Sequence, residues 1–264
     1  MLKEVILSFS FLVVSPPCSA TVTIEKYKTS NEVTIRIHHE IIEEDIVEFK
    51  NAIEAIEKDK KVLHMNAVQL NSRGGSGNAG RVIGRMIKDK KWNTYVSPKS
   101  KCVSACVFIL MGGVVRYPFG AIGVHRSTFT SGMEVDDSKL EEFVKNDIRI
   151  VKEFAVEIGM TNQLVDAILN TESWRVRYLT DQEKQHWQVF GTDRIYEERL
   201  FTSIAKEVKI ERDKFINIFR SNYEDCLKDA KSFDRTAYDC AKTKEVKVNY
   251  WNVLRILFAG EDLE

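Results

Sequence analysis

The chain has 264 residues, which is enough for one sizeable domain and a smaller appendage. Its 39 lysines and arginines balance 39 aspartates and glutamates, so the formal net charge is zero. Such a chain lacks the basic excess that nucleic acids and anionic membrane surfaces attract, and we expect neither as a partner.

The first twenty residues have the pattern of a secretory signal peptide. Lys3 precedes an apolar run at 5–14, and small residues at 18–20 precede Thr21. The run is too short to span a bilayer comfortably, which makes an uncleaved anchor the less favoured alternative. No later segment has enough consecutive apolar residues for a membrane helix. We therefore expect residues 1–20 to be removed and the mature protein to be periplasmic or secreted.

Strand and helix patterns alternate in the first half of the mature chain. Alternating apolar and polar residues predict a two-stranded hairpin at 21–26 and 32–38. Apolar residues recur at helical spacing between positions 46 and 56, and again between 82 and 87. Further apolar segments predict strands at 62–70, 94–96 and 121–125, and a buried helix or strand at 105–111.

The second half is predominantly helical by pattern. An amphipathic helix is predicted at 137–158, with Gly159 as its stop, and Thr180 begins another. After about Leu200 the sequence is charged and helical. Strands that alternate with helices predict an α/β domain with a mainly parallel sheet at 21–199, followed by a helical C-terminal extension at 200–264.

Three short segments carry the residue types of serine-nucleophile chemistry. A predicted strand runs into Gly74-Gly75, Ser104 stands at a strand-to-helix step, and His125 ends a later strand. The glycine turn can aim a backbone N–H at an oxyanion, the serine can attack a carbonyl, and the histidine can take its proton. Each residue alone has a structural alternative: a chain turn, a structural serine or a core histidine. Their order makes hydrolysis the leading hypothesis.

These segments resemble the ClpP/crotonase superfamily, and within it a set of exported ClpP-like proteins. The resemblance spans roughly residues 33–195 and is carried by Asn71-Ser72-Arg73-Gly74-Gly75, Cys102-Val103-Ser104-Ala105-Cys106 and the Gly123-Val124-His125 strand end. It implies stacked ββα units, a Ser-His-carboxylate triad and a trimeric or ring-shaped homo-oligomer. Arg73 stands where the family has proline, and no segment resembles a docking site for an ATP-driven unfoldase.

Carried over to this sequence, the resemblance makes Ser104 the nucleophile and His125 the general base. It assigns the oxyanion hole to the N–H groups of Gly74 and Ala105.

The third member of the triad stays open. The segment Arg177-Tyr178-Leu179-Thr180 matches the one that follows the family's aspartate, and counting back from it reaches Glu172. Asn170 and Asp166 are close enough to compete. A carboxylate is expected because it fixes the imidazole tautomer and stabilises the imidazolium.

Four cysteines remain after signal cleavage, and an even number in an exported chain favours disulfides. The Cα atoms of Cys102 and Cys106 would lie about 6 Å apart in a helix, which allows a bridge; the alternative is two small buried side chains. Cys226 and Cys240 can bond only if a helical hairpin breaks near Ser232. No histidine lies near either pair at ligand spacing, so no metal site is expected.

The sequence therefore predicts an exported ClpP-like serine hydrolase, a peptidase that acts on peptide or protein substrates without ATP, metal or other cofactor. The alternative is a catalytically inactive ClpP-like binding or assembly module. Acyl-thioester chemistry is disfavoured, because CoA esters are not expected outside the cytoplasm.

Export gives a direct prediction. The protein recovered from its compartment should begin at Thr21, because the small residues at 18–20 mark the cleavage point. N-terminal mass mapping tests this, and an intact Met1 or recovery from the cytoplasm would contradict it.

Overall fold

The computed structural model describes residues 21–26, 33–59, 66–127, 137–207 and 209–217. The predicted signal peptide, Cys226, Cys240 and the predicted hairpin break near Ser232 lie outside these residues. In the described part, no helix combines the length and the apolar character that crossing a membrane requires.

The described strands form one nine-stranded sheet with β3 at its centre. Strand β1 (Thr21–Lys26) pairs antiparallel with β2 (Val33–Ile41), and β2 runs parallel to β3 (Asn66–Gly75). On its other side β3 has two neighbours in succession, first β4 (Asn93–Val96) and then β5 (Lys101–Val103). The sheet therefore forks along β3.

Each branch of the fork ends in a short antiparallel strand. One branch continues from β4 to β6 (Val115–Pro118) and β9 (Gly191–Thr192). The other continues from β5 to β7 (Ala121–Val124) and β8 (Arg177–Tyr178). The second branch and the end of β3 carry the residues predicted for catalysis.

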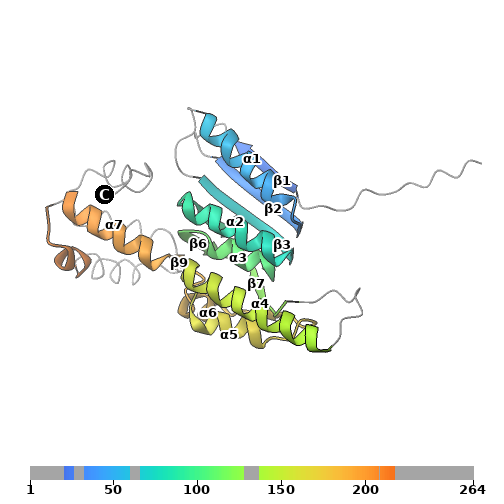
Figure 1. Cartoon of the computed structure of the whole chain (residues 1–264). Helices are drawn as coiled ribbons and strands as arrows, with labels where there is room; N and C mark the ends of the chain where they lie inside the picture. The colour runs from blue at the N-terminus through green and yellow to red at the C-terminus, as the bar shows by residue number, and fades with distance from the viewer. Residues whose placement is uncertain (1–20, 27–32, 60–65, 128–136, 208, 218–264) are drawn as a thin grey trace, which may run out of the picture.

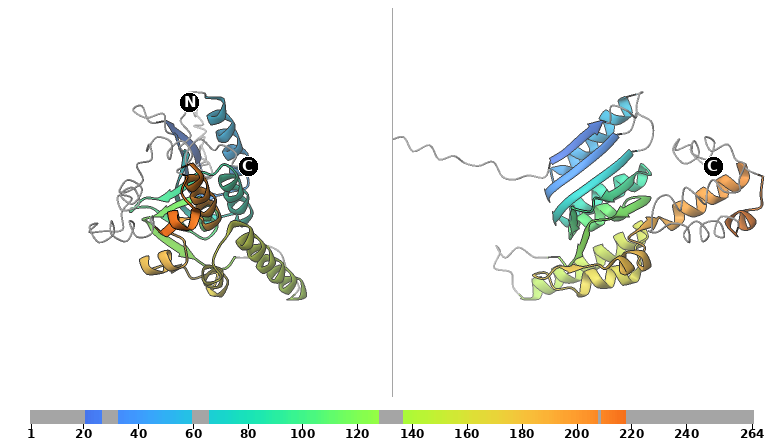
Figure 2. Two further views of the ribbon diagram at one scale, coloured as in Figure 1. Left: turned by 90° about the vertical axis from the view of Figure 1, so that its left-hand side faces the viewer. Right: turned by 180° about the vertical axis from the view of Figure 1, so that it is seen from behind.

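Helices cover one face of this sheet. Figure 1 shows α1 (Asp45–Lys58) and α2 (Gly77–Asp89) in front of β1–β3, and the view from behind in Figure 2 shows those strands in front. The other helices are α3 (Ala105–Met111), α4 (Asp137–Ile158), α5 (Asn162–Asn170), α6 (Asp181–His186) and α7 (Arg194–Glu207). The prediction of an α/β domain with a mainly parallel sheet is confirmed by these pairings.

The ambiguous segment 105–111 is a helix, and all seven residues of α3 are buried. It lies against α2 closely enough that two glycines of α2 are needed at the contact. A β-carbon on Gly80 would lie 2.5 Å from the Ala105 carbonyl oxygen, and one on Gly84 would lie 2.5 Å from the Phe108 carbonyl oxygen. This close approach fixes where α3 begins.

Several elements were not predicted. The strands β6, β8 and β9 have two to four residues, a length at which a period-2 pattern is a weak signal, although β4 and β7 with four residues each were predicted. The nine-residue helix α5 was also missed. The predicted start of a helix at Thr180 is confirmed as a capping box, in which the Thr180 hydroxyl accepts from the Glu183 N–H while the Glu183 carboxylate accepts from the Thr180 N–H.

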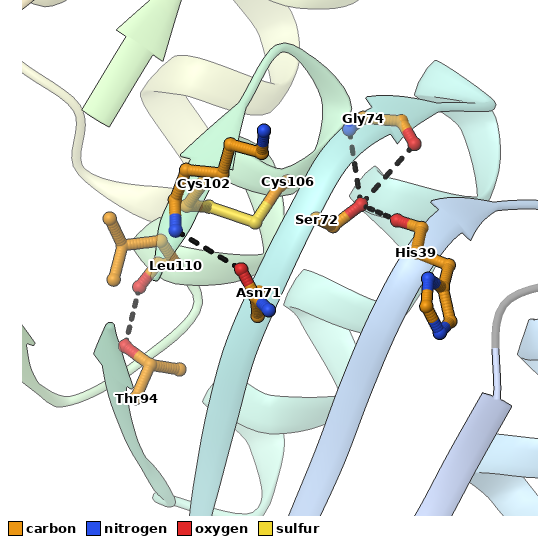
Figure 3. Close-up of a disulfide and its surroundings, with 9 residues drawn as sticks. His39, Asn71, Ser72, Gly74, Thr94, Cys102, Cys106 and Leu110 are labelled. Atoms are coloured by element: carbon orange, nitrogen blue, oxygen red, sulfur yellow. Dashed lines mark hydrogen bonds between the residues drawn. A yellow bond between two sulfur atoms is a disulfide. The ribbon is translucent and has the colours of Figure 1, made fainter. Parts of the chain in front are cut away.

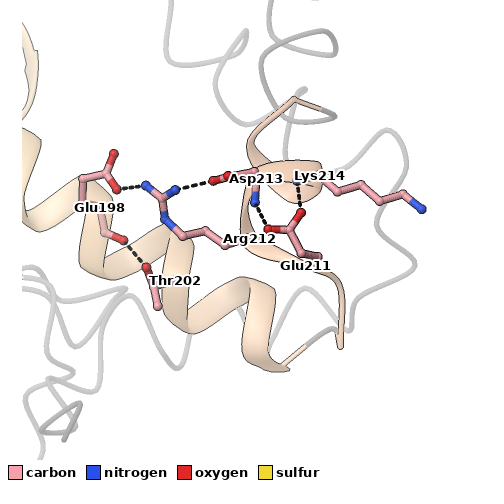
Figure 4. Close-up of polar contacts among 6 residues, drawn as sticks. All are labelled: Glu198, Thr202, Glu211, Arg212, Asp213 and Lys214. Atoms are coloured by element: carbon pink, nitrogen blue, oxygen red, sulfur yellow. Dashed lines mark hydrogen bonds and ion pairs between the residues drawn. The ribbon is translucent and has the colours of Figure 1, made fainter.

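Helix α7 crosses the predicted boundary at residue 200, and it belongs to a second, smaller apolar cluster built around Phe201, Ile204 and Phe215. Beside this cluster the Arg212 guanidinium contacts the carboxylates of Glu198 and Asp213 (Figure 4). These exposed ion pairs are of the kind that contributes little stability, so we expect the apolar cluster to hold the described residues 194–217 together.

The α2–α3 contact predicts different outcomes for two glycines of the same helix. Gly80→Ala should lower the free energy of unfolding by about 1–3 kcal/mol, because the new methyl group meets backbone that cannot move aside easily. Gly77→Ala is the matched control, since its β-carbon would meet only the flexible end of Arg81. Urea denaturation of both variants measures the difference, and equal stabilities would contradict the close contact.

Candidate active site

Three of the predicted site residues, Gly74, Ser104 and His125, lie at the carboxyl ends of parallel strands. Strands β2, β3, β5 and β7 run parallel, so their carboxyl ends lie on the same side of the sheet. Gly74 lies at the end of β3, Ser104 directly after β5, and His125 directly after β7. Segments that are far apart in the sequence thus meet where ligands bind in open α/β sheets.

Ser104 makes a sharp turn from β5 into α3. Its backbone has φ 57° and ψ −124°, a conformation that side-chain-bearing residues rarely adopt. Such a residue costs about 1–3 kcal/mol and persists only where its surroundings impose it. Here the Ser104 N–H donates to the Gly123 carbonyl at 2.9 Å, and the Ser104 carbonyl accepts from the Val107 N–H at 2.9 Å.

The Ser104 hydroxyl makes no capping hydrogen bond to α3, although the residue occupies the N-cap position. An ordinary N-cap serine would accept from a backbone N–H of the first turn. Among the described residues no hydrogen bond engages this hydroxyl, and a strained strand-to-helix turn with an available hydroxyl is the arrangement that nucleophilic serines adopt in hydrolases.

Gly74 and Ala105, the two predicted oxyanion donors, are brought together. A β-carbon on Gly74 would lie 2.7 Å from the Ser104 β-carbon and 3.3 Å from the Ala105 nitrogen. Gly74 also has φ 104°, which glycine adopts at little cost. Only glycine fits here, because both the backbone angle and the contact exclude a side chain.

The Gly74 N–H is already engaged in this structure. It donates to the Ser72 hydroxyl at 3.1 Å, and that hydroxyl in turn donates to the His39 carbonyl (Figure 3). Ser72 is buried, with 1% of its surface exposed. An oxyanion at Gly74 would therefore have to share or displace the Ser72 hydroxyl. The role of Gly74 as an oxyanion donor stays a prediction.

His125 is half-buried, and its Nδ1 lies 2.8 Å from the Arg126 carbonyl oxygen. A carbonyl only accepts, so this contact is a hydrogen bond when Nδ1 carries the proton. That tautomer leaves Nε2 as the acceptor, which is the form that a general base needs. In the described part of the chain, no hydrogen bond joins His125 to the Ser104 hydroxyl.

The segment that carries Glu172 runs beside Arg126, but Glu172 does not hydrogen-bond to His125 among the described residues. The Arg126 N–H donates to the Thr171 carbonyl at 2.8 Å, which places the 171–172 segment beside the residue after His125. The Glu172 side chain is exposed, and so are those of Asn170 and Asp166 in α5. The structure therefore leaves the third member of the triad as open as the sequence does.

A carboxylate that the sequence did not single out holds the turn after Gly75. Glu43 accepts from the Ser76 hydroxyl and from the Asn78 amide, and these hydrogen bonds hold the pKa of Glu43 below its usual value. The Ser76 N–H also donates to the Ile41 carbonyl at 2.7 Å. The turn that follows the glycines is thereby fixed to the loop after β2.

A disulfide joins Cys102 of β5 to Cys106 of α3, across Ser104 (Figure 3). Of the two alternatives for this pair, the structure has the bridge. Asn71 supports the same region, since its side-chain oxygen accepts from the Lys101 N–H at 3.2 Å. Within the described residues, no three His, Cys, Asp or Glu side chains gather as a metal site would require.

The sequence motif contains Asn71 and Ser72 but gives neither of them a role, and Glu43 was not singled out at all. Each of the three hydrogen-bonds across elements that are about 30 residues apart in the sequence. The signal that can be recognised in retrospect is the density of short polar side chains from Asn71 to Asn78.

No protein-family model matches the sequence, and no curated protein matches it. Similar solved structures include ClpP1 from Listeria monocytogenes, with 16% identity, a TM-score of 0.43, and coverage of 60% of this chain and 88% of that one. A mutant of the same ClpP1 has 18% identity and a TM-score of 0.46, covering 62% and 93%. A mutant of the 1510-N membrane-bound stomatin-specific protease has 19% identity and a TM-score of 0.43, covering 59% and 75%.

Ser72 gives a prediction about the turn. Ser72→Ala should lower the free energy of unfolding by about 1–3 kcal/mol, because it leaves the Gly74 N–H and the His39 carbonyl without their partner. Ser203→Ala in α7 is the control and should change it by less than about 0.5 kcal/mol, since that hydroxyl bonds only to the exposed Arg199 carbonyl. Chemical denaturation compares the two, and equal losses would contradict the bridging role of Ser72.

Proposed function

We propose that the protein is a serine hydrolase that cleaves peptide or related acyl bonds, with Ser104 as nucleophile and His125 as general base. One observation carries the proposal. Ser104 is held in a strained strand-to-helix turn at the carboxyl end of the parallel strands, where Gly74 and His125 also lie, and its hydroxyl does not cap α3. Glycine would adopt this backbone at less cost, so a serine at this position favours a role for its hydroxyl.

In the proposed reaction the Ser104 hydroxyl attacks the substrate carbonyl while His125 Nε2 takes its proton. The oxyanion that forms accepts a hydrogen bond from the Ala105 N–H at the start of α3, and a second from Gly74 once that N–H turns from Ser72. The histidine then protonates the leaving amine, and an acyl ester remains on Ser104. Water, deprotonated by the same histidine, releases the acid and restores the serine.

The tautomer of His125 needs a partner at Nδ1. The Arg126 carbonyl contacts that nitrogen at 2.8 Å and favours the proton there. Glu172 is the proposed carboxylate, because the 171–172 segment runs beside Arg126 and a rotation of an exposed side chain needs little free energy. Asn170 and Asp166 are the alternatives.

A binding or assembly module is the second candidate function. It is favoured by the engagement of the Gly74 N–H with Ser72 and by the lack of a Ser104–His125 hydrogen bond in the described residues. Catalytic hydrogen bonds are often loose before substrate binds, which keeps the hydrolase as the first candidate.

The proposal includes the compartment and the assembly. Residues 1–20 act as a cleaved signal, the mature protein is periplasmic or secreted, and it forms a homo-oligomer, either a trimer or a ring. These parts rest on the sequence pattern and on the resemblance alone.

A fluorophosphonate probe separates the two functions. A hydrolase with residues 21–264 should be labelled on Ser104, as located by peptide mass mapping, and Ser104→Ala should abolish labelling. His125→Gln should slow labelling by about 10²–10⁴-fold, the usual contribution of a general base. Ser173→Ala is the control and should label like the parent protein.

Glu172→Gln then tests the third position. A strong loss of labelling with an unchanged melting temperature would support Glu172 as the third member of the triad. An unchanged labelling rate would mean that the Arg126 carbonyl, and not Glu172, fixes the tautomer of His125. A folded parent protein that is not labelled, or labelling that survives Ser104→Ala, would favour the binding module.

A further inference from the structure

We infer that the Cys102–Cys106 disulfide is a positioning device that holds Ser104 in its reactive backbone conformation. This inference rests on the proposed function, since it assigns these two residues a part in the same site. It predicts that the nucleophile is formed only in the disulfide-bonded protein.

The disulfide closes a small ring with Ser104 at its centre. Cys102 lies in β5 and Cys106 in the first turn of α3, with their Cα atoms 5.2 Å apart, and each residue is 0% exposed. The ring contains five residues, and Ser104 is its middle one. Figure 3 shows the bond beside the end of β3, where Ser72 and Gly74 lie.

Each residue of the ring other than Ser104 is fixed by regular structure. Cys102 and Val103 pair with Ile122 and Gly123 of β7, so they must stay extended. Ala105 and Cys106 belong to α3, so they must stay helical. The whole change of chain direction therefore falls on Ser104.

The disulfide prevents the backbone at Ser104 from relaxing into an extended conformation. If the strand continued through Ser104, four extended steps would separate the two Cα atoms by about 13 Å. The bond holds them at 5.2 Å and excludes that relaxation. The pairing of β5 with β7 and the burial of α3 fix the elements on either side of the turn, and the bond ties these elements together directly across Ser104.

The burial of both cysteines indicates a permanent structural disulfide and not one that is reduced and re-formed for regulation. A thiol reductant must reach a sulfur atom in line with the bond, and here neither residue is accessible until the turn opens. The inference thus concerns how the site is built and makes no claim of redox regulation.

Two double variants of the full mature chain test the inference. Cys102→Ala/Cys106→Val removes the bond and keeps much of the buried volume. Cys226→Ala/Cys240→Ala is the matched control, with the same number of cysteines removed far along the chain. The first readout is the rate of fluorophosphonate labelling at Ser104. The second is hydrogen exchange at the Ser104 amide, which needs no activity and reports the bond to the Gly123 carbonyl.

The inference predicts that removing the bond slows labelling by about 10²-fold, the loss typical when a reacting group moves by about 1 Å. The Ser104 amide should lose protection while the amide of Leu70 in β3 keeps it. The control should match the parent in both readouts. Labelling and Ser104 protection that equal those of the parent would overturn the inference. Loss of protection at Leu70 as well would also overturn it, since the bond would then stabilise the whole domain.

The two readouts keep this inference apart from the proposed function. If the parent protein is not labelled, the proposal of a hydrolase is contradicted, and hydrogen exchange at the Ser104 amide alone decides whether the disulfide holds the turn. If the parent is labelled and the variant is labelled equally fast, the proposal of a hydrolase is supported and the positioning role of the disulfide is contradicted.

Discussion

The backbone of Ser104 is the constraint on which the site depends. A strand and a helix meet at this single residue, and neither can yield because both are paired or buried over their whole length. The chain therefore accepts a positive φ on a residue with a side chain, at a cost of about 1–3 kcal/mol. The direction of the Ser104 hydroxyl follows from that turn, and so does the position of the first N–H of α3. The proposed nucleophile and oxyanion donor would thus both depend on one backbone conformation.

The packing of α3 explains why the strain is not relieved by moving the helix. Gly80 and Gly84 let α2 approach the carbonyls of α3 directly, and the seven residues of α3 are all buried. A shift of α3 along its axis would bring side chains into backbone on one side and open a cavity on the other, and both are costly. The fork of the sheet at β3 then places Gly74 against this fixed helix start, because β5 takes over as the neighbour of β3 only at Ser72.

The sequence was sufficient for the class of fold and for the residues that meet at the sheet edge, because long periodic segments and an ordered set of motifs depend on local pattern. The helix at 137–158 and the hairpin of β1 and β2 are examples. It was insufficient where the outcome depends on partners distant in the chain. Ser72 reads as a small polar residue of a turn, and only the fold shows that its hydroxyl joins Gly74 to His39. The third triad position stays open in the structure as well, since the side chains at 166, 170 and 172 are all exposed and none of them hydrogen-bonds to His125 among the described residues.

The hydrogen bond between the Gly74 N–H and the Ser72 hydroxyl is compatible with both candidate functions. With the Gly74 N–H bonded to Ser72, the proposed oxyanion hole would keep only its Ala105 donor, and the buried hydroxyl satisfies a group that would otherwise lack a partner. A transition state carries more charge than a neutral hydroxyl and so accepts the stronger hydrogen bond, which gives it the advantage in competing for that N–H. A neutral ligand has no such advantage and would leave Gly74 with Ser72. The same hydrogen bond therefore suits a hydrolase that completes its oxyanion hole only as charge develops, and it suits a module that binds neutral segments without reacting with them.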